Sequence, residues 1–362
     1  MNVIISGGGT GGHIFPAISI AEELKKRYPD VSILFVGAKN RMEMEKIPAL
    51  GYDIIGLPIQ GFQRKFSLQN IKTVFNIIRS IIKAKNILKK FKPDIAIGVG
   101  GYASGPLLYA AQKMNIPTLI QEQNSYAGVT NKILAQSVQK VCVAYEGMER
   151  FFKPETIVFT GNPIRPQIQN IDCSREKATE HFSLDSTKKT VLVIGGSLGA
   201  RTLNHSITKN IHELEKENIQ IIWQTGKLYF QQALQQAKNI PSIHVYEFIK
   251  DMDIAFSAAD VIISRAGAGT ISELCVVGKP CILVPSPNVS EDHQTKNAQA
   301  LVSKNAALMV HDAEAVHVLW KNTFHLLQNS KKMNELHTNI QTMAKPHAAE
   351  HIVDEIESLI KK

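Results

Sequence analysis

The chain has 362 residues, which is too long for one comfortable core, so two domains are expected. Its four cysteines show no C-x-x-C spacing, which argues against a disulfide scaffold or a zinc site and fits a reducing cytosol. The formal net charge of +9 indicates an anionic partner without naming it. The N-terminus runs directly into an apolar strand, so no signal peptide is expected. No apolar run approaches the roughly 18 residues that span a bilayer.

The first forty residues predict a βαβ unit. Residues 3–6 and 33–37 are short apolar runs typical of buried strands, with a glycine loop at 7–13 and a helix ending near Tyr28 between them. The glycines satisfy G-x-G-x-x-G, so a dinucleotide site has to be considered. That site needs an acid at the end of the second strand, where this chain has Gly37-Ala38-Lys39. The pattern therefore disfavours NAD and leaves a glycine loop for some other phosphate.

Residues 62–92 carry many Lys and Arg side chains and no Asp or Glu. One interpretation is a helix that covers a sheet and exposes a basic face to solvent. However, the apolar side chains of this segment cover more of the helix surface than one core-facing stripe needs. The additional apolar side chains could insert into an anionic membrane surface. The predicted membrane patch is Phe66, Ile71, Lys72, Val74, Phe75, Ile78 and Arg79. A nucleic-acid partner is not expected, because no recognised binding motif accompanies the charge.

Two further loops of the first half follow predicted strands. Residues 94–99 lead into Gly100-Gly101-Tyr102, and residues 118–120 lead into Gln121-Glu122-Gln123-Asn124. Ligands of open α/β sheets bind outside the carboxyl ends of the strands. Three polar or glycine loops at this edge therefore favour a site over chance.

The second half repeats this design. Residues 159–166 have the composition of a hinge, and residues 191–201 again predict a strand, a glycine loop and a helix. Further strands are expected near 219–223, 243–246, 261–263 and 281–284, and the remainder is helical by period, with a break at Lys345-Pro346. We predict two Rossmann-like, doubly wound α/β domains facing a cleft, at 1–162 and 163–346. The helix at 347–362 is expected to pack back on the first domain.

The loop at 264–273 follows a buried apolar run. A helix is expected from near Thr270, whose hydroxyl can cap backbone N–H groups, and Gly267 and Gly269 allow close approach of a ligand. The carboxylate of Glu273 suits a sugar diol. From these residues alone, a nucleotide site and an ordinary βα turn are equally supported. Asp251-Met252-Asp253 resembles a metal-binding D-x-D, but acids also favour the first turn of a helix, so no metal is predicted.

Six motifs, in order along nearly the whole chain, resemble the MurG family of bacterial N-acetylglucosaminyltransferases. They are 8–13, 100–102, 122–124, 161–165, 195–200 and 265–273. The resemblance implies a GT-B fold, no cofactor, and inverting, metal-independent transfer of GlcNAc from UDP-GlcNAc to the C4 hydroxyl of MurNAc. The acceptor would be undecaprenyl-pyrophosphoryl-MurNAc-pentapeptide (lipid I), the product lipid II, and the location the cytoplasmic face of the plasma membrane.

The resemblance also assigns roles to residues. The implied donor-binding residues are Thr10, Gly11, Gly12, Asn124, Arg165, Ser197, Ile249 (through its backbone), Ala268, Gly269, Thr270, Glu273 and Gln294. The implied acceptor or phosphate loops contain Gly9, Gly101 and Tyr102. Some relatives carry two adjacent glutamines where this chain has His293-Gln294, so only Gln294 is carried over.

The chemistry needs a base for the acceptor hydroxyl and positive groups for the leaving UDP. His13 is the candidate base because its ordinary pKa suits proton transfer near neutrality; it could instead orient the glycine loop or a phosphate. Glu122 is the reserve base. Helix starts at Ser197 and Thr270, with Arg165 or Arg265, suit the leaving group. The alternatives are a UDP-GlcNAc 2-epimerase, a diacylglycerol glycolipid synthase, or a silent nucleotide-sugar-binding scaffold. The basic segment speaks against the epimerase, and His13 with Glu273 speaks against the scaffold.

Overall fold

The computed structural model describes residues 1–59, 68–196 and 198–361, and of residues 68–72 and 290 it describes the backbone only. It consists of two compact units. Unit 1 comprises Met1–Ile164 with Pro346–Lys362, and unit 2 comprises Arg165–Lys345. The sequence places the boundary after residue 162, and the division in the structure falls after Ile164.

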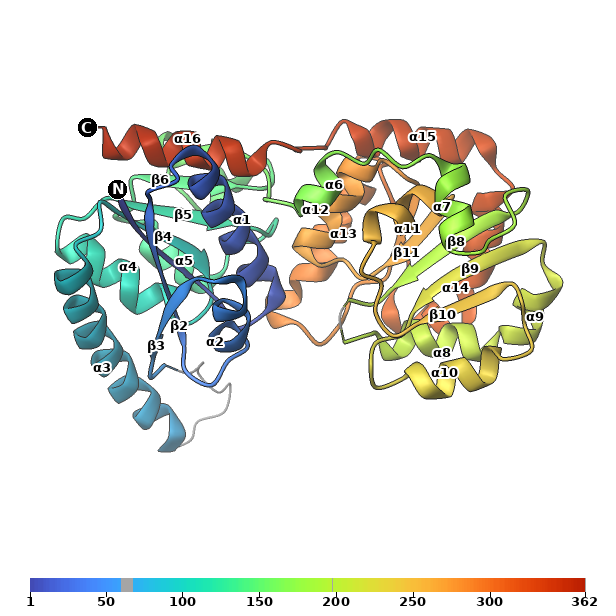
Figure 1. Cartoon of the computed structure of the whole chain (residues 1–362), viewed down its shortest axis with the longest axis horizontal. Helices are drawn as coiled ribbons and strands as arrows, with labels where there is room; N and C mark the ends of the chain where they lie inside the picture. The colour runs from blue at the N-terminus through green and yellow to red at the C-terminus, as the bar shows by residue number, and fades with distance from the viewer. Residues whose placement is uncertain (60–67, 197, 362) are drawn as a thin grey trace. The chain divides into compact units, whose positions relative to one another are not determined.

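Unit 1 is built on a parallel sheet, which has seven strands in the described part of the chain, in the order β3-β2-β1-β4-β5-β6-β7. The strands are β1 (Asn2–Gly7), β2 (Ser32–Ala38), β3 (Asp53–Leu57), β4 (Ile95–Gly100), β5 (Thr118–Glu122), β6 (Lys140–Val143) and β7 (Ile157–Phe159). They are short apolar runs because both faces of a parallel sheet are covered. Figure 1 shows the helices on either side of the sheet.

Strand alternation divides the core of unit 1 into two clusters. Val3 and Ile5 belong to a buried cluster with residues of α1 and α16, whereas Ile4 belongs to one with residues of α3 and α4. The helices are α1 (Gly11–Arg27), α2 (Glu43–Lys46), α3 (Leu68–Phe91), α4 (Ser104–Lys113), α5 (Val129–Leu134) and α16 (Ala348–Ile360). Helix α1 begins at Gly11, five residues before Pro16. His13 is the third residue of this helix and therefore lies in its first turn.

The last helix belongs to unit 1. In α16, Ile352 and Ile356 are buried in the same cluster as Leu24 of α1. Arg27 Nη1 donates to Asp354 Oδ1 at 2.6 Å and to Glu357 Oε1 at 3.1 Å. Figure 1 shows α16, in red, next to α1, with which it is in contact. The C-terminal segment thus covers one face of the unit 1 sheet, although all of unit 2 lies in sequence between this segment and the rest of unit 1.

Unit 2 has the same kind of sheet, with strand order β10-β9-β8-β11-β12-β13 and parallel pairing throughout its described strands. The strands are β8 (Lys189–Ile194), β9 (Ile219–Gln224), β10 (Ile243–Tyr246), β11 (Val261–Ser264), β12 (Cys281–Leu283) and β13 (Leu308–Met309). The five strands predicted from the sequence are confirmed to within two residues. The expectation that the remainder is helical is wrong at β13, because two residues are too short a run to show a period.

Helices cover both faces of this sheet (Figure 1). They are α6 (Pro166–Gln169), α7 (Arg175–His181), α8 (Arg201–Lys209), α9 (Ile211–Lys216), α10 (Phe230–Ala237), α11 (Met252–Ala258), α12 (Ala268–Val277), α13 (His293–Val302), α14 (Asp312–Leu327) and α15 (Ser330–Gln341). Val191 and Val193 of β8 are buried in a cluster with Leu203 of α8 and Leu319 and Trp320 of α14. None of the described helices has the length and apolar character needed to cross a membrane.

Candidate active site

Both sheets bring their glycine loops to a topological switch point. In unit 1, β1 lies between β2 and β4, so the chain leaves β1 and β4 in opposite directions; β8 has the same place between β9 and β11 in unit 2. Crevices at such points, outside the carboxyl ends of the strands, bind ligands in open α/β folds. The loops concerned are 8–13 and 100–102 in unit 1, and 195–200 and 265–270 in unit 2. The sequence predicts these loops one by one, and the strand order of each sheet shows which two lie next to each other.

The two loops of unit 1 are in backbone contact. Gly101 has φ +88°, and a Cβ built on it would clash with the carbonyl oxygen of Gly8. A side chain at this position is excluded both by the backbone conformation and by the contact. Tyr102, which follows directly, is exposed. Gly101 thus serves the close packing of the two loops and leaves Tyr102 at the surface.

His13 is held by the loop that precedes it. Its Nδ1 lies 3.0 Å from the carbonyl oxygen of Gly8 and 3.4 Å from the hydroxyl of Thr10. A carbonyl can only accept a hydrogen bond, so Nδ1 carries a proton, and the lone pair of the neutral ring is on Nε2. This is the arrangement of a base whose orientation is set by a second group.

Glu122, the reserve base, is placed differently. Its carboxylate is almost fully buried and accepts from the backbone N–H of Asn124 (3.1 Å) and of Gly128 (3.0 Å). It also accepts from the side-chain amides of Asn124 (3.3 Å) and Asn131 (2.8 Å). With four donors on its two oxygens, Glu122 holds the 124–131 segment in place. The geometry therefore gives no support to a role in taking the acceptor's proton.

In unit 2, Glu273 lies in α12 and forms a bidentate ion pair with Arg165. Arg165 Nε donates to Oε1 and Nη2 to Oε2, both at 2.6 Å. Burial alone would lower the pKa of Arg165, but the hydrogen bonds and charge of Glu273 raise it. The pairing is thus between two full charges. Both are predicted nucleotide-binding residues, and the structure brings them together across more than a hundred positions of sequence.

The start of α12 differs from the prediction. The helix begins at Ala268 with Gly267 as its N-cap residue, and the carbonyl of Gly267 accepts from the N–H of Ile271 at 2.9 Å. Thr270 therefore lies inside the first turn and is not the cap. The sequence favoured Thr270 because threonine is a common cap, whereas glycine also serves at this position. The N–H groups at the start of α12 and the Thr270 hydroxyl still belong to the same loop.

Gln294 connects the loops after two neighbouring strands. Its Oε1 accepts from the N–H of Ser286 at 2.8 Å and of Ala266 at 3.3 Å, after β12 and β11 respectively. A residue that the sequence analysis missed, Gln224, has a matching role at the end of β9. Its Nε2 donates to the carbonyl of Gly196 (3.1 Å), and its Oε1 accepts from the N–H of Ile249 (2.9 Å). A polar residue directly after the predicted strand at 219–223 was the available signal.

Other sequence candidates have structural roles or lie elsewhere. Arg265 donates to the carbonyls of Val284 (2.9 Å) and Pro285 (3.2 Å) and pairs with Asp312, so the structure does not support it as a leaving-group cation. Asp253 is in the first turn of α11, as the helix interpretation of D-x-D requires. No group of three or more metal-binding side chains occurs among the described residues. Ser197 lies outside those residues.

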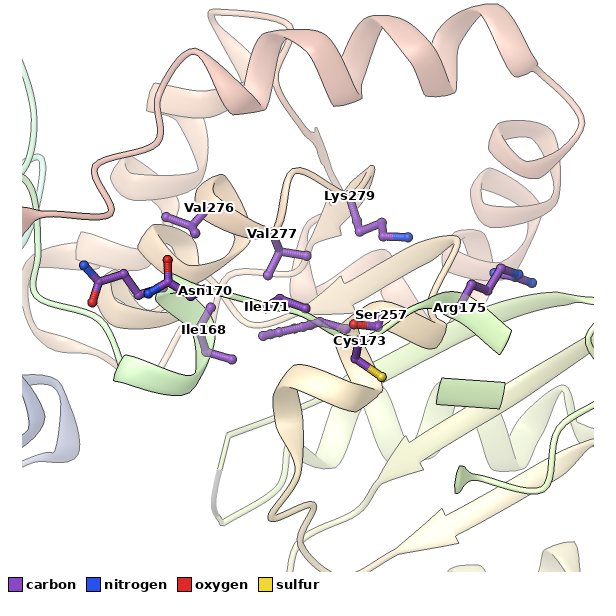
Figure 2. Close-up of a pocket in the computed structure, with 11 residues that line it drawn as sticks. Ile168, Asn170, Ile171, Cys173, Arg175, Ser257, Val276, Val277 and Lys279 are labelled. Carbon is purple, nitrogen blue, oxygen red and sulfur yellow. The ribbon is translucent and has the colours of Figure 1, made fainter. Parts of the chain in front are cut away.

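Unit 2 also contains a pocket of about 450 Å³. It is lined by residues of the 168–175 segment, by α11, and by the C-terminal end of α12 with Lys279. Figure 2 shows Ile168 and Asn170 at one side and Arg175 at the opposite side. Burial lowers the pKa of Lys279. The pocket adjoins the end of α12 remote from the 264–270 loop, so it is separate from the candidate active site.

This arrangement of two doubly wound units with paired glycine loops is that of the GT-B glycosyltransferases. Residues 3–143 match the glycosyltransferase family 28 N-terminal domain, and residues 190–352 match the family's C-terminal domain. The chain therefore belongs to glycosyltransferase family 28, and within it to the MurG group of N-acetylglucosaminyltransferases.

Relatives match over the full length. The UDP-N-acetylglucosamine–N-acetylmuramyl-(pentapeptide) pyrophosphoryl-undecaprenol N-acetylglucosamine transferase of Parabacteroides distasonis is 53% identical, over 99% of this chain and 98% of its own. The enzyme of the same name from Phocaeicola vulgatus is 54% identical, over 100% and 97%. The crystal structure of Acinetobacter baumannii MurG superposes with a TM-score of 0.80 at 30% identity, over 99% of each chain.

A UDP-GlcNAc 2-epimerase shares the fold. The Neisseria meningitidis enzyme, crystallised with UDP-GlcNAc, has a TM-score of 0.68 over 99% of this chain but only 16% identity. At that identity the likeness concerns the fold alone. The epimerase alternative is therefore not favoured.

Proposed function

We propose that this protein transfers GlcNAc from UDP-GlcNAc to the C4 hydroxyl of MurNAc in undecaprenyl-pyrophosphoryl-MurNAc-pentapeptide, forming lipid II. The observation that carries the proposal is the full-length identity of 53–54% to transferases named for this reaction. The paired carboxyl-edge loops in both units support it, because they supply backbone N–H donors suited to phosphates.

The donor is assigned chiefly to unit 2. Glu273 takes the ribose diol, since a carboxylate accepts two hydrogen bonds, and Arg165 remains beside the nucleotide. Ala268, Gly269 and Thr270 present the start of α12 to the diphosphate. The remaining donor residues are Ile249, through its backbone, Gln294, Ser197, and from unit 1 Thr10, Gly11, Gly12 and Asn124. The N–H of Ile249 is occupied by Gln224, so its carbonyl is the group left for the uracil.

In the proposed reaction every proton and electron pair is accounted for without a metal ion. The acceptor O4–H gives its proton to Nε2 of His13 as O4 forms a bond to C1 of GlcNAc. The bond from C1 to the UDP oxygen breaks, UDP leaves with the electron pair, and the anomeric centre inverts. Helix-start N–H groups and Arg165 stabilise the charge that develops on UDP. Nδ1–H on the Gly8 carbonyl supports this role for His13, because it keeps the lone pair on Nε2.

We propose that α3 docks on an anionic membrane surface, at the cytoplasmic face of the plasma membrane. Its core side includes Thr73, Ala84 and Leu88, which are buried. A second stripe is exposed although apolar: Val74 at 49%, Phe75 at 60%, Ile78 at 52% and Ile82 at 56%. The guanidinium of Arg79 lies 5.9 Å from the ring centre of Phe75. Phe66 lies outside the described residues, as do the side chains of Ile71 and Lys72.

An exposed apolar stripe flanked by cations, on a helix without an acidic residue, is typical of interfacial helices. Lys83 is not part of the stripe. Its ammonium donates to the carbonyl of Gly56 at 2.7 Å, and burial lowers its pKa. One apolar side of α3 therefore packs in the core of unit 1, and the other is available to bind a membrane surface.

The decisive experiment is incubation with UDP-GlcNAc and a lipid I analogue, followed by detection of the GlcNAc–MurNAc disaccharide product and released UDP. The proposal expects both in equal amounts. Free ManNAc with no lipid-linked disaccharide would show an epimerase. Intact UDP binding without turnover of either kind would show a scaffold. A diacylglycerol acceptor in parallel tests the glycolipid synthase.

A further inference from the structure

A buried carboxylate supports the glycine loop of unit 1. Glu43 is the first residue of α2, just after β2, and its side chain is fully buried. Oε2 accepts from the N–H of Gly9 at 2.9 Å, and Oε1 accepts from the N–H of Ala38 at 3.0 Å. A charge in such a place is expensive unless donors satisfy it, and these two N–H groups do so.

Glu43 and His13 bind the two ends of one peptide group. The N–H of Gly9 and the C=O of Gly8 belong to the same planar amide. The N–H donates to the Glu43 carboxylate, and the C=O accepts from Nδ1–H of His13 at 3.0 Å. The result is a continuous chain from carboxylate to amide to imidazole. Hydrogen bonds in such a chain polarise one another, so an anion on the N–H side makes the carbonyl a stronger acceptor.

The surrounding backbone leaves room for this carboxylate. A Cβ built on Gly8 would lie in contact with Glu43 Oε1, and one on Gly37 would lie 2.6 Å from Glu43 Cγ. Gly8 in the glycine loop and Gly37 in β2 therefore make space here for a side chain of the protein itself. Because Gly9 N–H is taken by Glu43, the N–H groups that remain for a phosphate are those further into the start of α1.

We propose that Glu43 is a positioning residue for His13: through the Gly8–Gly9 peptide it holds the imidazole in the Nδ1–H form, with the lone pair on Nε2. The carboxylate of a catalytic triad orients its histidine directly; here an amide group stands between the two. The inference rests on the proposed function in so far as Nε2 of His13 takes the acceptor's proton. The placement of Glu43, the peptide and His13 does not depend on the reaction.

The test is the tautomer of His13, read from the ¹⁵N shifts of histidine-labelled protein, with the His13 signals assigned by their loss in His13→Gln. In the wild type, His13 is expected in the Nδ1–H form, the minor form of free neutral histidine. In Glu43→Gln, one charge-assisted bond is lost, and the signals should move towards the Nε2–H form. For the same variant kcat should fall about 10-fold or more, as for other bonds to a charged group, while KM for UDP-GlcNAc stays within a factor of about two.

The control is Glu45→Gln, because Glu45 belongs to the same short helix but is exposed; it should change neither readout. Thermal unfolding establishes that each variant is folded. If Glu43→Gln does not fold, Glu43→Asp keeps the charge but draws it back by one bond, and the same shift in tautomer is expected. A wild-type His13 in the Nε2–H form, or an unchanged tautomer in a folded variant, would overturn the inference.

These outcomes separate the inference from the proposed function. Without any GlcNAc transfer by the wild type, the proposed function fails, while the tautomer still decides the role of Glu43. With normal transfer and an unchanged tautomer in Glu43→Gln, the function stands and the role of Glu43 is wrong.

Discussion

Arg165 and Glu273 lie 108 positions apart in sequence and meet in a bidentate ion pair, with both N···O distances at 2.6 Å. Arg165 precedes α6 at the beginning of unit 2, and Glu273 is on α12 beyond the fourth strand of its sheet. The pair matters because each member is proposed to contact the nucleotide. Arg165 holds the Glu273 carboxylate in a fixed orientation, so the ribose diol meets acceptors that are already aligned.

The first prediction concerns Glu273. In Glu273→Gln, the ribose loses a charged acceptor and Arg165 loses its partner, so KM and Kd for UDP-GlcNAc should rise about 10- to 100-fold, as expected for hydrogen bonds to a charged group. Isothermal titration with UDP-GlcNAc measures this. Glu217→Gln, an exposed glutamate of the same unit, should leave the affinity unchanged. Equal affinities for the two variants would refute a ribose contact.

The second prediction concerns His13. In His13→Ala, the kcat of transfer should fall about 10²-fold or more, the usual contribution of a general base, while UDP-GlcNAc binding is retained. Steady-state kinetics and titration together give the answer. His205→Ala, which removes an exposed histidine, is the control. A variant that binds UDP-GlcNAc poorly but keeps its kcat would show an orienting role in place of base catalysis.

The third prediction concerns the exposed stripe of α3. Burial of a large apolar side chain contributes roughly 1.5–3 kcal/mol, so the double variant Phe75→Ser/Ile78→Ser should bind vesicles with anionic headgroups about 10-fold more weakly or worse. Arg79→Glu should weaken binding further at low salt. Co-sedimentation with vesicles measures both.

The matched control for α3 is Leu228→Ser/Leu234→Ser, which removes two exposed leucines of unit 2. It should not alter vesicle binding. Binding that is equal on neutral and anionic vesicles, and equal for all these variants, would exclude the membrane role of α3.

The fourth prediction concerns Gly101. Alanine at a left-handed position costs about 1–3 kcal/mol, and at Gly101 the contact with the Gly8 carbonyl adds to this. Gly101→Ala should therefore lower the Tm more than Gly51→Ala does. Gly51 has φ +79° and open space where a Cβ would stand, so it isolates the cost of the conformation. Calorimetry of both variants gives the comparison, and equal Tm values would mean that the loop contact is relaxed at no cost.

The fifth prediction concerns the attachment of α16. Burial by itself would raise the pKa of Glu357, but hydrogen bonds from Arg27, Tyr28 and Lys361 outweigh it and lower the pKa below 4.5. A lowered folded-state pKa contributes stability above the unfolded-state pKa, and this is lost as pH falls through the folded value. Glu357→Gln should therefore be less stable than the wild type at pH 7, and the difference should shrink progressively below about pH 4.5.

Thermal unfolding at a series of pH values measures this difference. Glu213→Gln, an exposed glutamate on α9, serves as the control and should follow the wild type throughout. A difference for Glu357→Gln that persists unchanged at the lowest pH would show that the pairing with Arg27 is not its source.

Much of this protein could be predicted from sequence because the signals are local. Short apolar runs such as 33–37 and 261–263 are typical of strands in a parallel sheet, because both faces of such a sheet are buried. A glycine loop that directly follows such a run lies at the carboxyl edge of the sheet. The order of six motifs was enough to indicate the family. Local signals were weaker at helix starts: the glycine loop predicted at 7–13 contains the first turn of α1, which begins at Gly11, and Thr270 was favoured over the glycine that caps α12.

By itself, the sequence determined the two α/β domains, the loops of each carboxyl edge and the residue types they carry. The tertiary structure decided which of those side chains meet. The sequence suggested catalytic roles for Glu122 and Arg265, but both side chains form hydrogen bonds to neighbouring loops. Glu43 and Gln224, in contrast, form hydrogen bonds to the glycine loops and support them. The reason is that strand order sets which loop ends lie side by side. A buried charge or amide must then bind whatever donors that order places within reach.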